Sequence, residues 1–257
     1  MGFFSTRFAL YPTFLRLYRL VKRVFITLFF AHLIYTLLLI FLPVVSTPTI
    51  FGQWISGKKI EKEWVNLEHI SISMQHAVVA GEDQAFENHF GIDVDAIEKA
   101  IKFNKKHKKK KGASTISQQV AKNVFLWQDR TWIRKGLELY STFVIELFWS
   151  KDRILEVYLN VAEMGDGIFG AEAAAKHFFG KHASKLTAGE AATIAACLPN
   201  PIRYQVNDPD AHVLKRKEWI LSQMENIEWE KWPLSIFSKK YCINNWFLNI
   251  YKLKRGK

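Results

Sequence analysis

One stretch near the N-terminus constrains the fold of this 257-residue chain more than any other part of it. Residues 24–45 are almost wholly apolar, and no Lys, Arg, Asp or Glu occurs between Val24 and Gly57. An α-helix needs about 20 such residues to cross a bilayer, whereas a signal-peptide core is shorter and precedes a small-residue cleavage site. The sequence therefore predicts one N-terminal transmembrane helix over residues 24–45.

Charged residues before this segment predict its orientation. Basic residues favour the cytoplasmic side of a membrane, and no acidic residue occurs in the first 23 positions. We expect residues 1–23 to form a basic cytoplasmic arm and residues 46–65 a juxtamembrane connector. The rest of the chain is expected on the opposite, extracytoplasmic side of the membrane. The basic residues of the arm are Arg7, Arg16, Arg19, Lys22 and Arg23.

Helical spacing of apolar residues dominates residues 66–228, and no strand ladder is evident, so a mainly α domain is predicted there. Ser73 is expected to cap the first helix, and Asp93 or Asp95 the second. A later helix is expected to carry Leu137, Tyr140, Val144 and Phe148. The residues expected to face inward on the second helix are Val94, Ile97 and Ile101.

Two capping boxes mark further helix starts, because Thr115 and Thr187 are each followed three residues later by Gln118 and Glu190. Residues 229–257 combine aromatic and basic side chains. That composition is typical of a membrane interface, and equally of a C-terminal helix packed on the domain. Both alternatives stay open for this tail.

Two adjacent carboxylates, Glu82 and Asp83, end the first predicted helix of the domain. Burial and a neighbouring like charge both raise the pKa of a carboxyl group. A general base working near neutral pH needs such a pKa. The alternative is a solvated surface pair without catalytic function.

A cluster of small, hydroxyl and amide residues lies at the start of a later helix, between Gly112 and Asn123. A helix N-terminus with hydroxyl groups suits a phosphate or a sugar. The alternative is plain capping by Thr115 and Gln118, and the two readings are compatible.

A basic cluster follows, in which Arg134 and Glu138 are four residues apart and therefore share a helix face. These residues can clamp a diphosphate leaving group, with the carboxylate orienting the cations. The alternative is a surface ion pair that contributes little to stability. The basic members are Arg130, Arg134 and Lys135.

Taken together, these segments resemble glycosyltransferase family 51, the peptidoglycan glycosyltransferases found alone or fused to penicillin-binding transpeptidases. The resemblance covers roughly residues 65–205. No transpeptidase domain is evident, so the chain resembles the monofunctional members. The motifs are Glu82-Asp83-x-x-Phe86-x-x-His89-x-Gly91, Gly112-Ala113-Ser114-Thr115-Ile116-x-Gln118-Gln119, Arg134-Lys135-x-x-Glu138, Lys151-x-x-Ile154-Leu155-Glu156-x-Tyr158-Leu159-Asn160, and Gly167-x-x-Gly170 leading to Phe179-Gly180-Lys181.

The resemblance implies a lysozyme-like, mainly helical fold and the polymerisation of lipid II by a glycan carried on undecaprenyl diphosphate. It implies that Glu82 is the general base in β-1,4 transfer with inversion. Glu138 matches the second catalytic carboxylate, which places a metal, assists the leaving group or holds the cationic clamp. Positions matching substrate-binding residues are Asp83, Phe86, His89, Ser114, Thr115, Gln118, Gln119, Lys122, Asn123, Arg130, Arg134 and Lys135.

The resemblance implies no organic cofactor and at most a divalent cation, Mg²⁺ or Mn²⁺, whose ligands the sequence does not identify. Expected partners are lipid II, the plasma membrane and, as candidates, penicillin-binding transpeptidases. The net charge of +12 also suits nucleic acid, but an extracytoplasmic location excludes it. Two alternatives stay open: a lysozyme-like lytic glycosidase, and a membrane-tethered scaffold for wall assembly without enzymatic activity.

Overall fold

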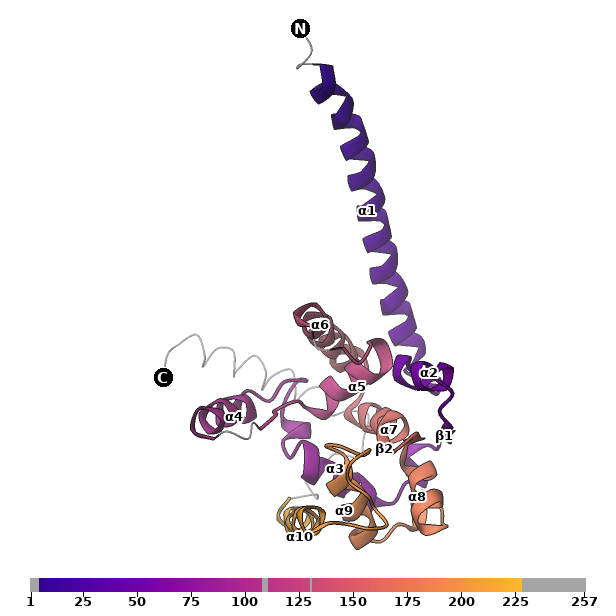
Figure 1. Cartoon of the computed structure of the whole chain (residues 1–257), viewed down its shortest axis with the longest axis vertical. Helices are drawn as coiled ribbons and strands as arrows, with labels where there is room; N and C mark the ends of the chain where they lie inside the picture. The colour runs from indigo at the N-terminus through magenta and orange to yellow at the C-terminus, as the bar shows by residue number, and fades with distance from the viewer. Residues whose placement is uncertain (1–4, 108–110, 130, 228–257) are drawn as a thin grey trace. The chain divides into compact units, whose positions relative to one another are not determined.

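The computed structural model describes residues 5–107, 111–129 and 131–227 (Figure 1). The chain forms two compact units, residues 1–42 and residues 43–257. Two features singled out from the sequence, Arg130 and the 229–257 tail, lie outside the described residues.

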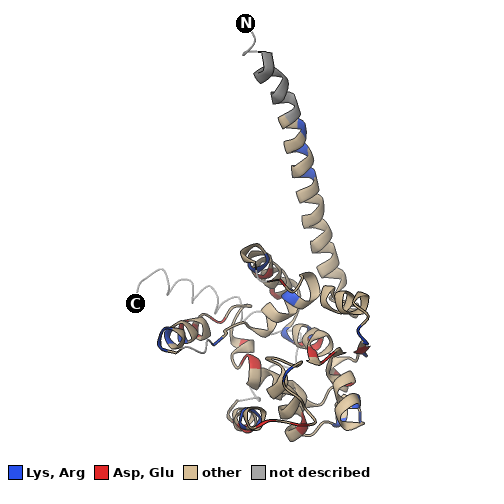
Figure 2. Cartoon of the chain, in the orientation of Figure 1, with Lys and Arg blue, Asp and Glu red and all other residues tan. Residues whose placement is uncertain are grey.

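The first unit contains helix α1 (Ser5–Leu38), whose segment Phe14–Leu38 is long and apolar enough to cross a membrane. In Figure 2 the described basic residues of α1 all lie in its N-terminal part. The helix ends at Leu38, earlier than the predicted span of residues 24–45, and hydrogen-bonded turns continue to Leu42. It begins inside the predicted arm, so the described part of that arm, from Ser5, is continuous with the predicted span.

The second unit is built mostly from helices (Figure 1). A three-stranded sheet and three short 3-10 turns connect them. The helices are α2 (Pro48–Ile55), α3 (Ile72–Glu82), α4 (Val94–Lys106), α5 (Ile116–Phe125), α6 (Trp132–Phe148), α7 (Lys151–Val161), α8 (Ala171–Phe179), α9 (Ala188–Cys197) and α10 (Ala211–Asn226). The 3-10 turns are η1 (Leu67–His69), η2 (Phe86–Asn88) and η3 (Ala183–Lys185).

The small sheet was not predicted from the sequence. Strand β3 (Ile168–Phe169) lies between β1 (Glu61–Lys62), which is parallel to it, and β2 (Glu163–Gly165), which is antiparallel. Strands of two or three residues are too short to show the alternation that identifies a strand in a sequence. The domain is nevertheless mainly α, as predicted.

Two groups of helices frame the core. In one group α9 packs against α3 and α10, and in the other α5 packs against α6 and α7. The buried face of α9 is rich in alanine, which lets its neighbours approach closely. Gly81 on α3 shows how tight this packing is, since an added Cβ would lie 3.2 Å from Cδ1 of Ile220 on α10.

The helix starts were predicted with mixed success. Both capping boxes form, and Asp93 caps α4. The prediction for α3 was wrong, because Ser71 and not Ser73 accepts the capping hydrogen bond, from the Met74 amide. The inward face predicted for α4 was also wrong. Val94 and Ile101 are exposed and Ala100 is buried, since α4 buries so little of its surface.

Asn160 on α7 fastens the segment that precedes α3. Its side chain is fully buried, donates to the carbonyl oxygens of Val65 and Glu156, and accepts a hydrogen bond from the Val65 amide. The three donor–acceptor distances are 2.8–2.9 Å. Asn160 therefore holds the backbone at Val65, 95 positions away in the sequence, against α7.

Replacing Asn160 by alanine is expected to lower the free energy of unfolding by about 2–4 kcal/mol, because buried backbone groups at Val65 would lose their partners. Denaturant unfolding of the full chain in detergent measures this change. Asn207→Ala is the matched control, since Asn207 is exposed and should change stability little. A loss below about 0.5 kcal/mol for Asn160→Ala, within the range of surface substitutions, would contradict this role.

Candidate active site

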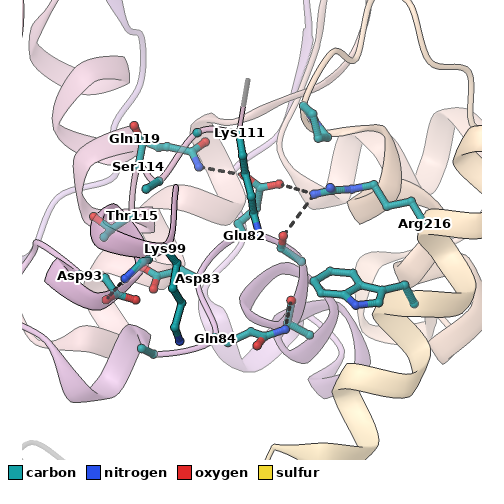
Figure 3. A pocket seen from close by; sticks show the side chains of 18 of the residues that line it. Glu82, Asp83, Gln84, Asp93, Lys99, Lys111, Ser114, Thr115, Gln119 and Arg216 are labelled. Atoms are coloured by element: carbon teal, nitrogen blue, oxygen red, sulfur yellow. Dashed lines mark hydrogen bonds and ion pairs between the residues drawn. The ribbon is translucent and has the colours of Figure 1, made fainter. Parts of the chain in front are cut away.

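The candidate active site is a cavity of about 1090 Å³ at the ends of several helices. Glu82 and Asp83 enter it from the end of α3, Gln119 from α5, and Arg216 from α10 (Figure 3). The other wall includes Lys99 of α4 and the segment before α5. Residues far apart in the sequence therefore converge on the Glu82 carboxylate.

Glu82 is held on both of its oxygens. The Gln119 amide donates to Oε2 at 2.9 Å, and the Arg216 guanidinium donates to Oε1 at 3.1 Å. Arg216 also donates to the Gly81 carbonyl at 3.1 Å, which fixes the arginine against the end of α3 (Figure 3). Tyr158, fully buried beneath the site, makes a long 3.4 Å contact with the Gln119 oxygen.

The electrostatic setting of Glu82 suits a proton acceptor. Burial raises the pKa of this carboxyl above its ordinary value, and the neighbouring charge of Asp83 adds to the increase. The Gln119 hydrogen bond and the Arg216 charge lower the pKa but do not cancel the effect of burial. A carboxylate with a raised pKa is a stronger base than an ordinary glutamate, which general-base chemistry near neutral pH needs.

Asp83 connects the loop that carries His89 to the start of α5. His89 Nε2 lies 2.9 Å from Oδ1 of Asp83, and the Ile116 amide at the start of α5 donates to Oδ2 at 2.9 Å. The Asp83 side chain is only 2% exposed, so it is committed to these partners. This arrangement sets α5, and with it Gln119, beside Glu82.

A buried ion pair supports the same loop from behind. Lys151 at the start of α7 lies 2.7 Å from Glu146 and donates to the His89 carbonyl at 2.8 Å. Its ammonium also lies 4.5 Å from the ring centre of Phe86, which is fully buried. The predicted site residues Phe86 and His89 therefore lie under the cavity wall.

The hydroxyl and amide cluster before α5 is used largely for capping. Thr115 accepts a hydrogen bond from the Gln118 amide and donates to the Gly91 carbonyl, while Gln118 accepts from the Thr115 amide. Thr115 and Ser114 also line the cavity, and Asn123 lies half-buried on α5. Thr115 thus caps α5 and also lines the cavity, so the two interpretations of this segment are compatible, as expected from the sequence.

The described cations of the predicted clamp gather around Glu138. Arg134 lies 2.6 Å and Lys135 2.5 Å from its two oxygens, and Glu138 is almost fully buried. Lys122 on α5 forms no ion pair with any described residue. Burial lowers the pKa of its ammonium, and the charges of Glu138 and Glu82 both act on it. We call Lys122, Arg134 and Lys135 the basic cluster.

The surroundings of Glu138 do not form a metal-binding set. Both of its oxygens are engaged by cations, and no group of three or more His, Cys, Asp or Glu side chains gathers in the described part of the chain. Mg²⁺ and Mn²⁺ prefer sites rich in oxygen ligands. No chemical step is therefore assigned to a divalent cation.

Arg216 is the site residue that the sequence analysis missed. It lies beyond residue 205, where the resemblance ends, and 134 positions after the carboxylate that it contacts. The available signal was the spacing on α10, where Val213 and Ile220 are fully buried and Arg216 follows Val213 by three residues. That signal predicts a helix but does not reveal which side chain the arginine meets.

Replacing Arg216 by glutamine is expected to shift the acidic limb of the pH–rate profile to higher pH. The arginine charge lowers the pKa of Glu82, so its removal raises that pKa and leaves less of the base ionised at a given pH. Rates of the full chain measured between about pH 5 and 9 test this. Lys217→Gln on the same helix is the control, and an unmoved acidic limb in Arg216→Gln would contradict the assignment.

Comparisons with known proteins show the family of this chain. Residues 49–225 match the family described as Transglycosylase. A biosynthetic peptidoglycan transglycosylase of Yersinia pseudotuberculosis serotype O:3 (strain YPIII) is 56% identical over 180 residues, which cover 68% of this chain and 75% of that protein. The protein of the same name from Yersinia pestis (strain Pestoides F) is 55% identical over the same shares.

Proposed function

This chain belongs to the transglycosylase family, and from that premise we propose that it polymerises lipid II into the glycan strands of peptidoglycan. It is a glycosyltransferase with a lysozyme-like, mainly helical domain. The observation that carries the proposal is Glu82, a carboxylate of raised pKa that Gln119 and Arg216 orient in a large cavity.

In the proposed reaction Glu82 accepts the proton of the 4-hydroxyl of the acceptor N-acetylglucosamine. The hydroxyl oxygen then forms a bond to the anomeric carbon of the donor sugar, while the bond from that carbon to the lipid diphosphate breaks. Displacement from the opposite face inverts the anomeric carbon and gives a β-1,4 linkage. Gln119 and Arg216 keep the carboxylate in place, so little reorganisation is needed when the proton moves.

The leaving group carries the negative charge that develops as this bond breaks. We propose that the basic cluster stabilises it, with Lys122 as the member that forms no ion pair among the described residues. Glu138 holds Arg134 and Lys135 in a fixed arrangement and does not itself contact the reacting atoms. A preorganised cation stabilises the charge of the transition state more than that of the ground state.

The lipid carrier of the proposed substrate fits a membrane-anchored enzyme. Helix α1 suits a single-pass anchor by its length and composition. We propose that the N-terminus lies in the cytoplasm and that the catalytic domain faces the periplasm at the inner membrane. Penicillin-binding transpeptidases are proposed partners, because they cross-link the strands that this enzyme would make.

A single assay separates this function from its two rivals. The purified full-length chain is incubated with labelled lipid II and, separately, with finished glycan. Polymer from lipid II supports the proposal, cleavage of finished glycan supports a lytic glycosidase, and neither product supports a scaffold. The basic cluster favours polymerisation, because hydrolysis of finished glycan releases no diphosphate.

A further inference from the structure

One face of α10 lines the cavity beyond its contact with Glu82. His212, Lys215, Arg216 and Trp219 all line the cavity, and their spacing of three and four residues places them on one side of the helix. Val213 and Ile220, on an adjacent side of the helix, are fully buried in the core. Of the cavity residues, Arg216 also bonds to Gly81 and Glu82 of α3, so the buried side and this arginine both hold the helix in place.

Trp219 stands out on this face because its large apolar ring stays open to the cavity. Trp219 is 45% exposed, although an indole is among the side chains that gain most from burial. Arg216, which contacts Glu82, lies three residues earlier, or about 4.5 Å along the helix axis. The indole and the proposed general base therefore line the same cavity, on either side of Arg216.

Other groups that line the same cavity suit a saccharide. Gln84, two residues after α3, donates to Gln223 of α10 at 3.1 Å. The rings of Tyr204 and His212, which also line the cavity, are stacked with centres 5.1 Å apart. Aromatic faces contact the C–H groups of a pyranose ring, and amides bond its hydroxyl and acetamido groups.

We propose that Trp219 is a saccharide-binding residue for the acceptor. Its indole stacks on the acceptor disaccharide and directs the attacking hydroxyl toward Glu82. This inference rests on the proposed function and deepens it, because it assigns the α10 wall to the sugar. The basic cluster, in contrast, takes the diphosphate of the donor.

Kinetics with separate donor and acceptor test the proposal. Initial rates are measured at a fixed concentration of lipid-linked donor glycan while lipid II is varied. Trp219→Ala is expected to raise the KM for lipid II about tenfold with a smaller change in kcat, and Trp219→Phe should recover most of the loss because it keeps an aromatic face. Leu214→Ala is the matched control, since Leu214 is a 43%-exposed residue of α10 that does not line the cavity. Unchanged KM in Trp219→Ala would overturn the proposal.

A binding measurement separates failure of this inference from failure of the proposed function. Saturation-transfer NMR with the peptide-free disaccharide GlcNAc-MurNAc is expected to show contact with the wild-type chain and loss of that contact in Trp219→Ala. Equal signals in both chains would overturn the saccharide site. A wild-type chain that makes no polymer but shows this Trp219-dependent binding would overturn the proposed function and keep the site.

Discussion

A chain carrying Glu82→Gln is expected to fold and to lose polymerisation, with kcat on lipid II falling about 10²–10⁴-fold. Glutamine keeps the shape of the side chain but cannot accept the hydroxyl proton at neutral pH. The loss should appear in kcat and in kcat/KM alike, because proton transfer occurs only in the transition state. Steady-state rates of the full-length enzyme in detergent measure it, with Glu218→Gln, an exposed position on α10, as the control.

The stability of the same variant separates catalysis from folding. Burial raises the pKa of Glu82 in the folded chain, so the folded state binds the carboxyl proton more tightly than the unfolded state does. This tighter proton binding stabilises the fold fully at pH values below the pKa of an unfolded glutamate. That contribution is lost as pH rises through the folded pKa. At neutral pH Glu82→Gln should therefore melt no lower than the wild type. Near wild-type turnover in a folded Glu82→Gln chain would remove Glu82 from the mechanism.

The second large effect is expected at Lys122. Lys122→Ala should lower kcat about 10²–10³-fold with little change in the KM for the acceptor, because the lost charge acts on the departing diphosphate. Among the basic cluster it is the member without an ion-pair partner in the described residues, so its charge is available to the leaving group. Lys102→Ala is the control, since Lys102 is exposed on α4 and paired with Glu98.

A substitution at Arg134 tests whether the clamp needs the planar geometry of the guanidinium or only its positive charge. Arg134→Lys keeps the charge but loses the planar guanidinium that contacts Glu138, so turnover should fall in this variant as well. Turnover that is unchanged in both Lys122→Ala and Arg134→Lys would leave the clamp without support.

The sequence predicted those parts of the site that depend on local signals. The capping box of Thr115 and Gln118 predicted the start of α5, and the carboxylate pair was placed at the end of an apolar helix, where α3 ends. The role of Glu82 as the base came from the family resemblance and stays a prediction. The sequence did not predict which residues converge on Glu82. Arg216 meets Glu82 across 134 positions, and no local pattern specifies such a contact.

Asp83 shows a second limit of sequence reasoning. The family resemblance predicted a substrate-binding role for Asp83, which stays a prediction; the structure adds that Asp83 lines the cavity while its side chain bonds to His89 and to the amide of Ile116. Whether a carboxylate turns toward a cavity or toward a neighbouring helix depends on packing that the motif does not contain. The same holds for α4, whose apolar residues stay exposed because few elements pack against it.

The stereochemistry of the product tests most directly whether Glu82 acts as a base on the acceptor. The full-length chain is incubated with lipid II, the reaction is quenched with acid during turnover, and the polymer is analysed by NMR and the protein by mass spectrometry. The proposed mechanism predicts β-1,4 linkages throughout and protein of unchanged mass. Retained α linkages, or a sugar covalently attached to Glu82, would contradict it.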